Sequence, residues 1–220
     1  MGAALTQLIP IQELSPGAVG AIRNQVINAL IAQVSQELSL PEDKLVVRDP
    51  RPFNDLQMYE IAATAKTVDK WTYDTTTTTV NSFTTVTGTA TMADQRYVAL
   101  FGVRDLRLGI GIHTTAMDLL DSTAVVVAAT GENAAARVIA GQVVSFIKIT
   151  VGGADKVIWD LTSMEAYPDN LIGFSPTAVI IPQNSSYNVG YYMVSTVAGK
   201  RAYLQLIGVV VEPRGKLISP

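Results

Sequence analysis

Short apolar runs dominate the C-terminal part of the chain, and turn-forming residues separate them. The runs are rich in Val, Ile, Tyr, Phe and Trp, and Gly, Pro or Asn stands between one run and the next. This pattern is typical of β-strands joined by tight turns. The predicted strands are Val143–Val151, Lys156–Leu161, Thr177–Pro182, Ser186–Thr196 and Lys200–Pro213.

The last of these runs is apolar on both faces. Side chains alternate between the two faces of a strand, so a strand with two apolar faces must be covered on both sides. The covering layer is either another part of this chain or another subunit. Ala202, Leu204, Leu206 and Val210 share one face, and Tyr203, Ile207, Val209 and Val211 share the other.

One segment near the start has the spacing of an amphipathic helix. Ser15 is a suitable N-cap, Pro16 fits the first helical position, and Pro41 ends the segment. We expect this helix to dock its apolar side, either on the β domain of its own chain or on a partner subunit or membrane surface. The apolar positions are Val19, Ile22, Val26, Leu30 and Val34, joined by Ile27, Ile31 and Leu38.

The segments between the helix and the last strands are more polar. Residues 41–56 contain three prolines and clustered charges around one short predicted strand, Leu45–Arg48, which indicates a linker. The stretch from about 64 to 91 is rich in threonine and includes the run Thr75–Thr79. Threonine favours strands and leaves both faces able to hydrogen-bond, so we predict an exposed β excursion.

These elements predict a mainly β protein. We expect an antiparallel β-sandwich or jelly-roll barrel of about eight to ten strands, with one long N-terminal α-helix. Gly152–Asp155 is predicted to be a tight hairpin turn. The domain boundaries are an N-terminal segment and helix at 1–40, a linker at 41–56, a single β-sandwich domain at 57–213 and a tail at 214–220.

Composition narrows the possible functions. Hydrophobic residues make up 48% of the 220 residues, charged residues only 16%, and the formal net charge is −3. Such a chain folds, but it offers no basic surface for nucleic acid. It shows no signal peptide and no apolar run long enough to span a membrane. We therefore expect much of the surface to be covered in the working state.

The sequence contains few groups for chemistry. It has no cysteine, and His113 is its only histidine, so thiolate sites and multi-histidine metal sites are excluded. Gly109 and Gly111 lack the third glycine of a dinucleotide loop, and no Walker-type loop occurs. We expect no enzyme activity, no cofactor, no metal and no small-molecule substrate.

Two other functions remain open. A lectin- or adhesin-like binding module would use exposed aromatic side chains, for which the candidates are Tyr187, Tyr191, Tyr192 and Trp159. A glycoside hydrolase would use a carboxylate pair, and the place to look is Asp160, Glu165 and Asp169. Carboxylates beside aromatic residues also describe an ordinary junction between a strand and a loop.

The whole pattern resembles a viral coat protein of the jelly-roll type, in particular those of tailless icosahedral phages and archaeal viruses with an internal membrane. The resemblance is carried by the nearly uncharged N-terminal segment, the threonine-rich excursion and two closing stretches, PTAVIIPQNSSYNVGYYMV and AYLQLIGVVVEPRG. Coat proteins that contact nucleic acid directly resemble one another in a basic N-terminal arm, whereas here residues 1–22 carry only Glu13. The resemblance therefore implies a shell protein in the virion, made in the host cytoplasm, that does not bind the genome itself.

We accordingly expect a self-assembling structural protein that forms an icosahedral shell. Its partners would be copies of itself, with room for a second coat protein and for contact between the helix and an internal membrane. Assembly would proceed through the helix and the apolar face of the last strand. The predicted interface residues are Val19, Ile22, Val26, Leu30, Val34, Tyr203, Ile207, Val209 and Val211.

Overall fold

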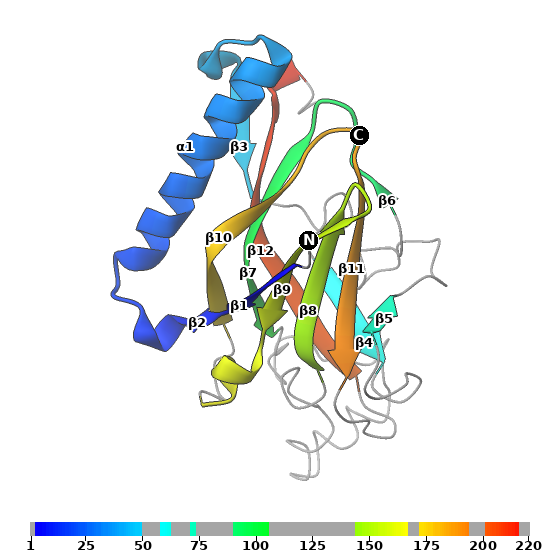
Figure 1. The fold of residues 1–220 in the computed structure, drawn as a ribbon. Coiled ribbons are helices and arrows are strands. Elements are labelled where there is room, and N and C mark those ends of the chain that lie inside the picture. Colours follow the sequence, from blue (N-terminus) through cyan, green and yellow to red (C-terminus); the bar gives the residue numbers. More distant parts are fainter. Residues whose placement is uncertain are drawn as a thin grey trace, which may run out of the picture.

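The computed structural model describes residues 3–49, 58–62, 71–73, 90–105, 144–166, 172–193 and 201–215. Within these ranges the chain forms twelve strands in two sheets and one long α-helix, α1 (Figure 1). The predicted mainly β fold is confirmed. His113 and most of the threonine-rich stretch lie outside the described residues.

The first sheet, sheet A, has the strand order β1-β9-β8-β11-β5, and β6 also pairs with β11. All its neighbours are antiparallel except β1, which runs parallel to β9. Its strands are β1 (Ala4–Gln7), β5 (Trp71–Tyr73), β6 (Ala90–Thr91), β8 (Val144–Val151), β9 (Ala154–Asp160) and β11 (Ser186–Met193).

The second sheet, sheet B, has the order β2-β10-β7-β12-β3, and β4 also pairs with β12. Every pair in it is antiparallel. Its strands are β2 (Ile9–Pro10), β3 (Leu45–Arg48), β4 (Met58–Ala62), β7 (Tyr97–Asp105), β10 (Ile172–Ile181) and β12 (Arg201–Pro213).

Both sheets contribute to one core between them. Val98, Leu100 and Val210 of sheet B and Ile149 and Trp159 of sheet A are buried in the same cluster. The inward positions alternate along each strand, as a half-buried strand requires. The two sheets are therefore held together by apolar side chains.

Helix α1 (Ala18–Leu38) covers the other face of sheet B, where it contacts β3, β7, β10 and β12 (Figure 1). Leu30 and Val34 of the helix are buried against Tyr97, Phe101 and Val209 of the sheet. The part of sheet B under α1 is thus covered on both faces by its own chain.

The start of the helix differs from the prediction. The N-cap is Gly17, no side chain caps the helix, and Ser15 instead accepts a turn hydrogen bond from Ala18 N–H through its backbone carbonyl at 2.9 Å. Two short strands, β1 and β2, and the 3-10 turn Ile11–Glu13 precede the helix. The first residues therefore belong to the sheets, and the helix comes after them.

The predicted turn between β8 and β9 is confirmed. Gly152 and Gly153 have φ values of 61° and 75°, which L side chains rarely adopt, and they close a two-residue hairpin. Nested pairs extend outward from this hairpin: β7 with β10, β5 with β11, and β3 with β12. These strand pairs thus lie one outside another around the Gly152–Gly153 hairpin.

Candidate assembly surface

The helix and the apolar face of β12 contact each other within one chain. Leu30, Val34, Val209 and Val211 are all 0% exposed in one shared cluster. These four residues were predicted to form an interface between subunits; within one copy they pack against each other. The physical reason is that α1 lies on the face that β12 would otherwise leave open.

Most of the remaining predicted interface residues also pack within one copy. Val19, Ile22, Val26 and Ile207 are half-buried and pack against the same cluster. The side chain of Tyr203 lies outside the part that the structure describes. The apolar side of α1 thus faces sheet B, and the predicted contact of the helix with a membrane stays a prediction.

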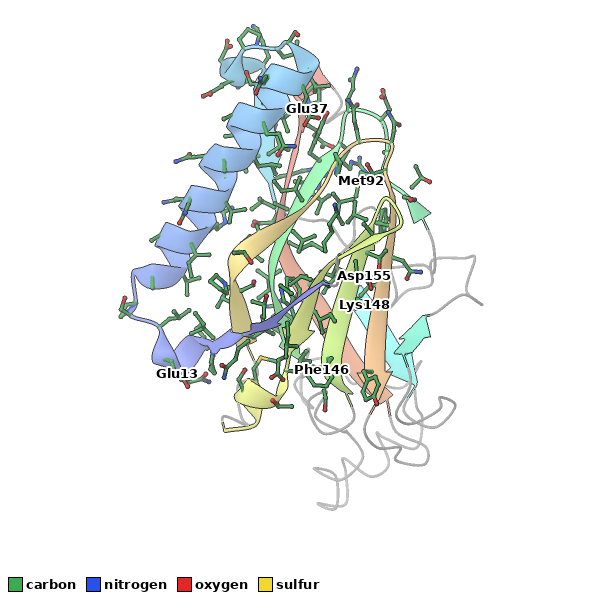
Figure 2. All side chains as sticks on the ribbon, viewed as in Figure 1. Glu13, Glu37, Met92, Phe146, Lys148 and Asp155 are labelled. Carbon is green, nitrogen blue, oxygen red and sulfur yellow. The ribbon has the colours of Figure 1, made fainter. Side chains whose placement is uncertain are left out.

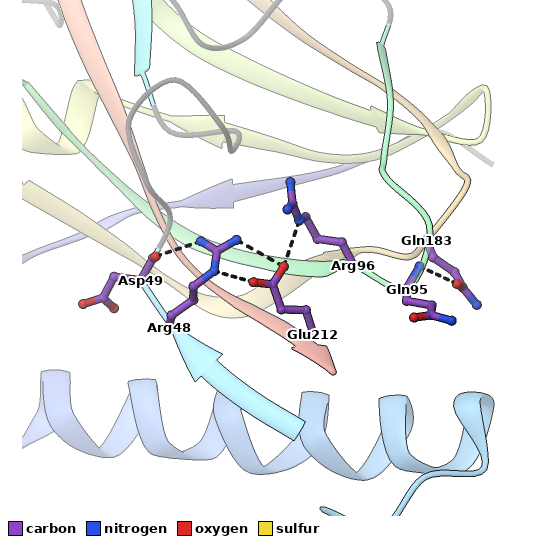
Figure 3. Close-up of polar contacts among 6 residues, drawn as sticks. All are labelled: Arg48, Asp49, Gln95, Arg96, Gln183 and Glu212. Atoms are coloured by element: carbon purple, nitrogen blue, oxygen red, sulfur yellow. Dashed lines mark hydrogen bonds and ion pairs between the residues drawn. The ribbon is translucent and has the colours of Figure 1, made fainter. Parts of the chain in front are cut away.

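A buried carboxylate joins three elements at one end of sheet B (Figure 3). Glu212 of β12 is 0% exposed and accepts hydrogen bonds from Arg48 Nε at 2.8 Å and Arg48 Nη2 at 3.3 Å. It also accepts one from Arg96 Nε at 3.1 Å. We call Arg48, Arg96 and Glu212 the carboxylate clamp, because it ties β3 and the start of β7 to the end of β12.

The clamp keeps its carboxylate ionised. Burial by itself would raise the pKa of Glu212, but hydrogen bonds and positive charge from Arg48 and then Arg96 outweigh it and lower the pKa below 4.5. A carboxylate held in this way does not exchange protons near neutral pH. The clamp is therefore suited to holding strands together, and it makes a poor general acid or base.

The loops beside the clamp are linked by further hydrogen bonds. Gln95 N–H donates to Gln183 Oε1 at 2.8 Å, as Figure 3 shows, and Asn184 Nδ2 donates to Asp94 at 3.2 Å. Met92 N–H donates to the Ser185 carbonyl at 2.9 Å. These contacts fix the loop before β7 to the loop between β10 and β11.

The outer face of sheet A carries a different kind of surface. In the described part of the chain no helix lies over it, in contrast to sheet B. Residues that stand opposite each other in the register form rows across the strands. From β1 to β5, one row consists of Gln7, Asp160, Phe146, Tyr192 and Trp71. The neighbouring row includes Leu5, Ile158 and Lys148. Phe146, Ile158 and Tyr192 are half-buried, and Leu5 is 63% exposed; we call these four residues the outer patch.

Polar groups border the outer patch. Lys148 Nζ lies 3.2 Å from Asp155 Oδ2, and Thr150 Oγ1 donates to Asp155 Oδ1 at 2.8 Å (Figure 2). The hydrogen bond from Thr150, followed by the contacts with Lys148, lowers the pKa of Asp155 against a smaller opposing effect of burial. The charges at this border are thus paired with each other.

The aromatic residues considered for carbohydrate binding do not form one surface. Trp159 is 0% exposed between the sheets, and Tyr187 packs against the same core. Tyr192 faces outward and meets Phe146 edge to face, with ring centroids 6.0 Å apart and an angle of 63° between the rings. The side chain of Tyr191 lies outside the described part. Of the described candidates, Trp159 and Tyr187 thus face the core and Tyr192 faces outward.

Of the three residues considered for hydrolysis, the structure describes the side chain of Asp160 alone. Asp160 accepts hydrogen bonds from the Thr162 N–H at 2.8 Å and the Thr162 hydroxyl at 2.6 Å, so it shapes the turn after β9. The side chain of Glu165, and all of Asp169, lie outside the described residues. Within the described ranges, no three His, Cys, Asp or Glu residues are grouped to hold a metal ion.

Grooves open on the surface of the described part, and two of them have similar volumes. One, of about 330 Å³, lies between Ile11 and the outer face of sheet B, with Arg104 and Asp49 in its lining. The other, of about 360 Å³, lies between β1, β9 and β10 and has Ala4, Thr6 and Lys156 in its lining.

Comparison with known proteins adds no identification. No protein-family model matches the chain, and no curated protein matches it. Among the described helices, none combines the length and the apolar character that crossing a membrane requires. The function must therefore be argued from the fold and the outer patch.

Proposed function

We propose that this chain is a structural subunit that assembles with copies of itself, and that the assembly is a viral shell. The observation that carries the proposal is the difference between the two sheets. Sheet B is covered by α1, whereas the outer face of sheet A presents Leu5, Phe146, Ile158 and Tyr192 with no described helix over them. Apolar groups that gather on one face of a folded protein and are only partly covered indicate a contact surface.

The strand pairing supports a jelly roll within this proposal. In that fold an antiparallel ribbon is rolled up so that the first strand pairs with the last, the second with the last but one, and so on inward. The pairs β3 with β12, β5 with β11, β7 with β10 and β8 with β9 follow this rule. Jelly rolls serve as viral coat domains, lectins and cupins.

The chemistry favours the coat protein among these three. Cupin metal sites are built mainly from histidine, and this chain has one histidine. A lectin of the predicted kind would need its aromatic residues on one surface, but Trp159 and Tyr187 face the core. A shell subunit needs neither a metal nor a ligand platform. A second coat protein in the shell stays a prediction.

A charge placed in the outer patch tests the proposal. Ile158 stands opposite Lys148 in the register of β8 and β9, so Ile158→Glu gains a cross-strand partner of opposite charge and leaves the subunit folded. The same charge disfavours burial of the patch against another subunit. Asn28→Glu, on the exposed side of α1, is the matched control.

Sedimentation velocity at micromolar concentration measures the outcome. We expect the wild-type protein and Asn28→Glu to form oligomers whose mass rises with concentration, and Ile158→Glu to shift toward the monomer of 23.5 kDa. Circular dichroism establishes that both variants are folded. A wild-type protein that stays monomeric over this concentration range contradicts the proposal.

A further inference from the structure

The strand β1 has a free edge. Leu8 N–H donates to the Asp160 carbonyl at 3.4 Å, which fixes the alternation of hydrogen bonds along the parallel pair of β1 and β9. The N–H and C=O groups of Thr6 therefore point toward β9, and those of Leu5 and Gln7 point away from it. No described strand lies on that outer side, because β1 is the last strand of sheet A.

This edge lacks proline and charge, two of the features that keep sheet edges from pairing. Sheet B has Pro10 in its edge strand β2, and Pro176 in the part of β10 that extends beyond β2. Proline and charged side chains are the usual means of blocking an edge. β1 has neither, and the first charged side chain in the chain is Glu13.

A second observation points to the same strand. Leu5 is the one large hydrophobic residue that is exposed among the described residues, at 63%. It stands beside Ile158 in the outer patch, directly at the free edge. An unpaired backbone and an exposed leucine at the same place indicate that another strand is added here.

We infer that β1 pairs antiparallel with β1 of a second copy, so that two copies of sheet A continue into one sheet; this rests on the proposed self-assembly. A strand that pairs with its own copy forms an isologous contact, in which both sides are made of the same residues. Because β1 carries no charge, two copies of it do not repel each other, whereas a charged strand would.

The direction of the backbone groups sets the register. A two-fold axis at Thr6 places Leu5 opposite Gln7 of the other copy, so every outward N–H and C=O of these two residues finds a partner. Thr6 then faces its own counterpart as the closer, non-hydrogen-bonded pair. Its side chain lies over the groove between β1, β9 and β10, which leaves room for the second one.

The strength of this contact is limited by its length. A strand of four residues buries far less than the ~1,000 Å² of a stable interface, so the pair is weak in isolation. It adds to the burial of the outer patch, which continues across the axis through Leu5. A test must therefore trap the contact covalently.

The absence of cysteine from the sequence makes this trapping clean. In Thr6→Cys, the two thiols of a non-hydrogen-bonded antiparallel pair lie within the range that a disulfide spans. Ala29→Cys, on the exposed side of α1, is the control for random collision. Under a mild oxidant we expect Thr6→Cys to form disulfide-linked dimers at least about tenfold faster than Ala29→Cys.

A second substitution separates pairing from mere proximity. Gln7→Pro removes an outward N–H and leaves the β1–β9 hydrogen bonds in place, because Gln7 N–H does not point toward β9. Added to Thr6→Cys, it lowers the rate of dimer formation to that of Ala29→Cys. Circular dichroism checks that the double variant keeps its fold.

The outcomes distinguish this inference from the proposed function. If Thr6→Cys cross-links no faster than Ala29→Cys while the wild-type protein forms oligomers that Ile158→Glu disrupts, the β1 contact is wrong and self-assembly stands. If Thr6→Cys dimerises rapidly but the wild-type protein stays monomeric, the contact is right and the proposed function fails. If cross-linking is slow and the protein stays monomeric, both are wrong.

Discussion

Burying a single carboxylate is costly unless positive charge is close to it, and Glu212 illustrates the balance. Its side chain is completely buried, while those of Arg48 and Arg96 are 11% and 20% exposed. The arginines therefore compensate the buried charge and still retain some contact with water. This arrangement stabilises one end of sheet B only as long as both signs of charge are present.

Replacing Glu212 with Gln leaves two arginines without a countercharge. We expect Glu212→Gln to lower the free energy of unfolding at pH 7 by about 3 kcal/mol, measured by urea denaturation. The control is Asp49→Asn, which breaks the ion pair of Arg23 with an Asp49 side chain that is 76% exposed. That change should cost no more than about 1 kcal/mol. Equal effects of the two substitutions would contradict a stabilising role for the clamp.

The same carboxylate makes stability depend on pH. Because the pKa of Glu212 is lower in the folded than in the unfolded state, its contribution is complete above about pH 4.5 and is lost as the pH falls below that value. The difference in unfolding free energy between the wild-type protein and Glu212→Gln should therefore shrink in acid. A difference that stays constant from pH 7 to pH 3 would argue against this assignment.

The contribution of Tyr97 to stability depends on pH in the opposite direction. Burial, followed by the nearby carboxylate of Glu37, raises the pKa of Tyr97 from 10.0 to about 12. Between these values the unfolded chain loses a proton that the folded chain keeps, so stability falls by up to about 1.4 kcal/mol per pH unit as the pH rises. We expect Tyr97→Phe to lack this loss in thermal unfolding between pH 10 and 12. A wild-type protein and variant that weaken in parallel there would refute it.

Single side chains were the hardest feature to predict from sequence. Trp159 and Tyr187 sit among turn-forming and charged residues, yet alternation turns them inward once the strands pair. Burial depends on which face a strand turns to its partner sheet, and this is set by contacts far apart in the chain. For Asp160, the local sequence favoured a strand-to-loop junction, and its hydrogen bonds to Thr162 agree with that.

At the scale of elements, the docking of α1 accounts for the second apolar face of β12. The sequence predicts that both faces of β12 are covered, and the structure confirms this for the last part of the strand, where Val210 lies between the sheets and Val209 under the helix. The sequence does not identify the layer that covers the second face, because the spacing of apolar residues does not specify what they pack against. The helix also begins at Ala18 and not near Ser15, since turn geometry at Ser15–Gly17 overrides the capping preference.

Leu30 tests how much this packing stabilises the fold. Its side chain is fully buried between α1 and sheet B, so Leu30→Ala leaves a cavity and should lower the free energy of unfolding by about 2–5 kcal/mol. Asn28→Ala, on the exposed side of the same helix, should change it by no more than about 0.5 kcal/mol. Urea denaturation of both variants gives the comparison. A loss below about 1 kcal/mol for Leu30→Ala would mean that the helix is not docked in solution.

At the scale of the whole molecule, local sequence patterns predict the class of fold, whereas the pairing of distant strands determines how the strands are arranged in the sheets. Alternation and glycine placement predicted strands and the Gly152–Gly153 hairpin because both are decided within a few residues. β1 and β2 were missed because strands of four and two residues are too short to show a period. Their positions in the sheets are fixed by pairing with β9 and β10, whose residues lie more than 140 positions further along the sequence.

The proposed assembly changes what the uncovered side of sheet A means. With α1 docked, the apolar surface that first suggested a shell protein is largely internal, so assembly depends on the outer patch and the free edge of β1. Both lie at the same side of the molecule, which allows one contact to use them together. Their combined area, and not the helix, should determine whether copies associate.

Negative-stain electron microscopy of the purified protein at high concentration tests self-assembly most directly. The account predicts closed or symmetric particles of uniform size, and their loss in Ile158→Glu under the same conditions. A field of separate 23.5 kDa subunits in the wild-type protein, unchanged by concentration, would contradict it.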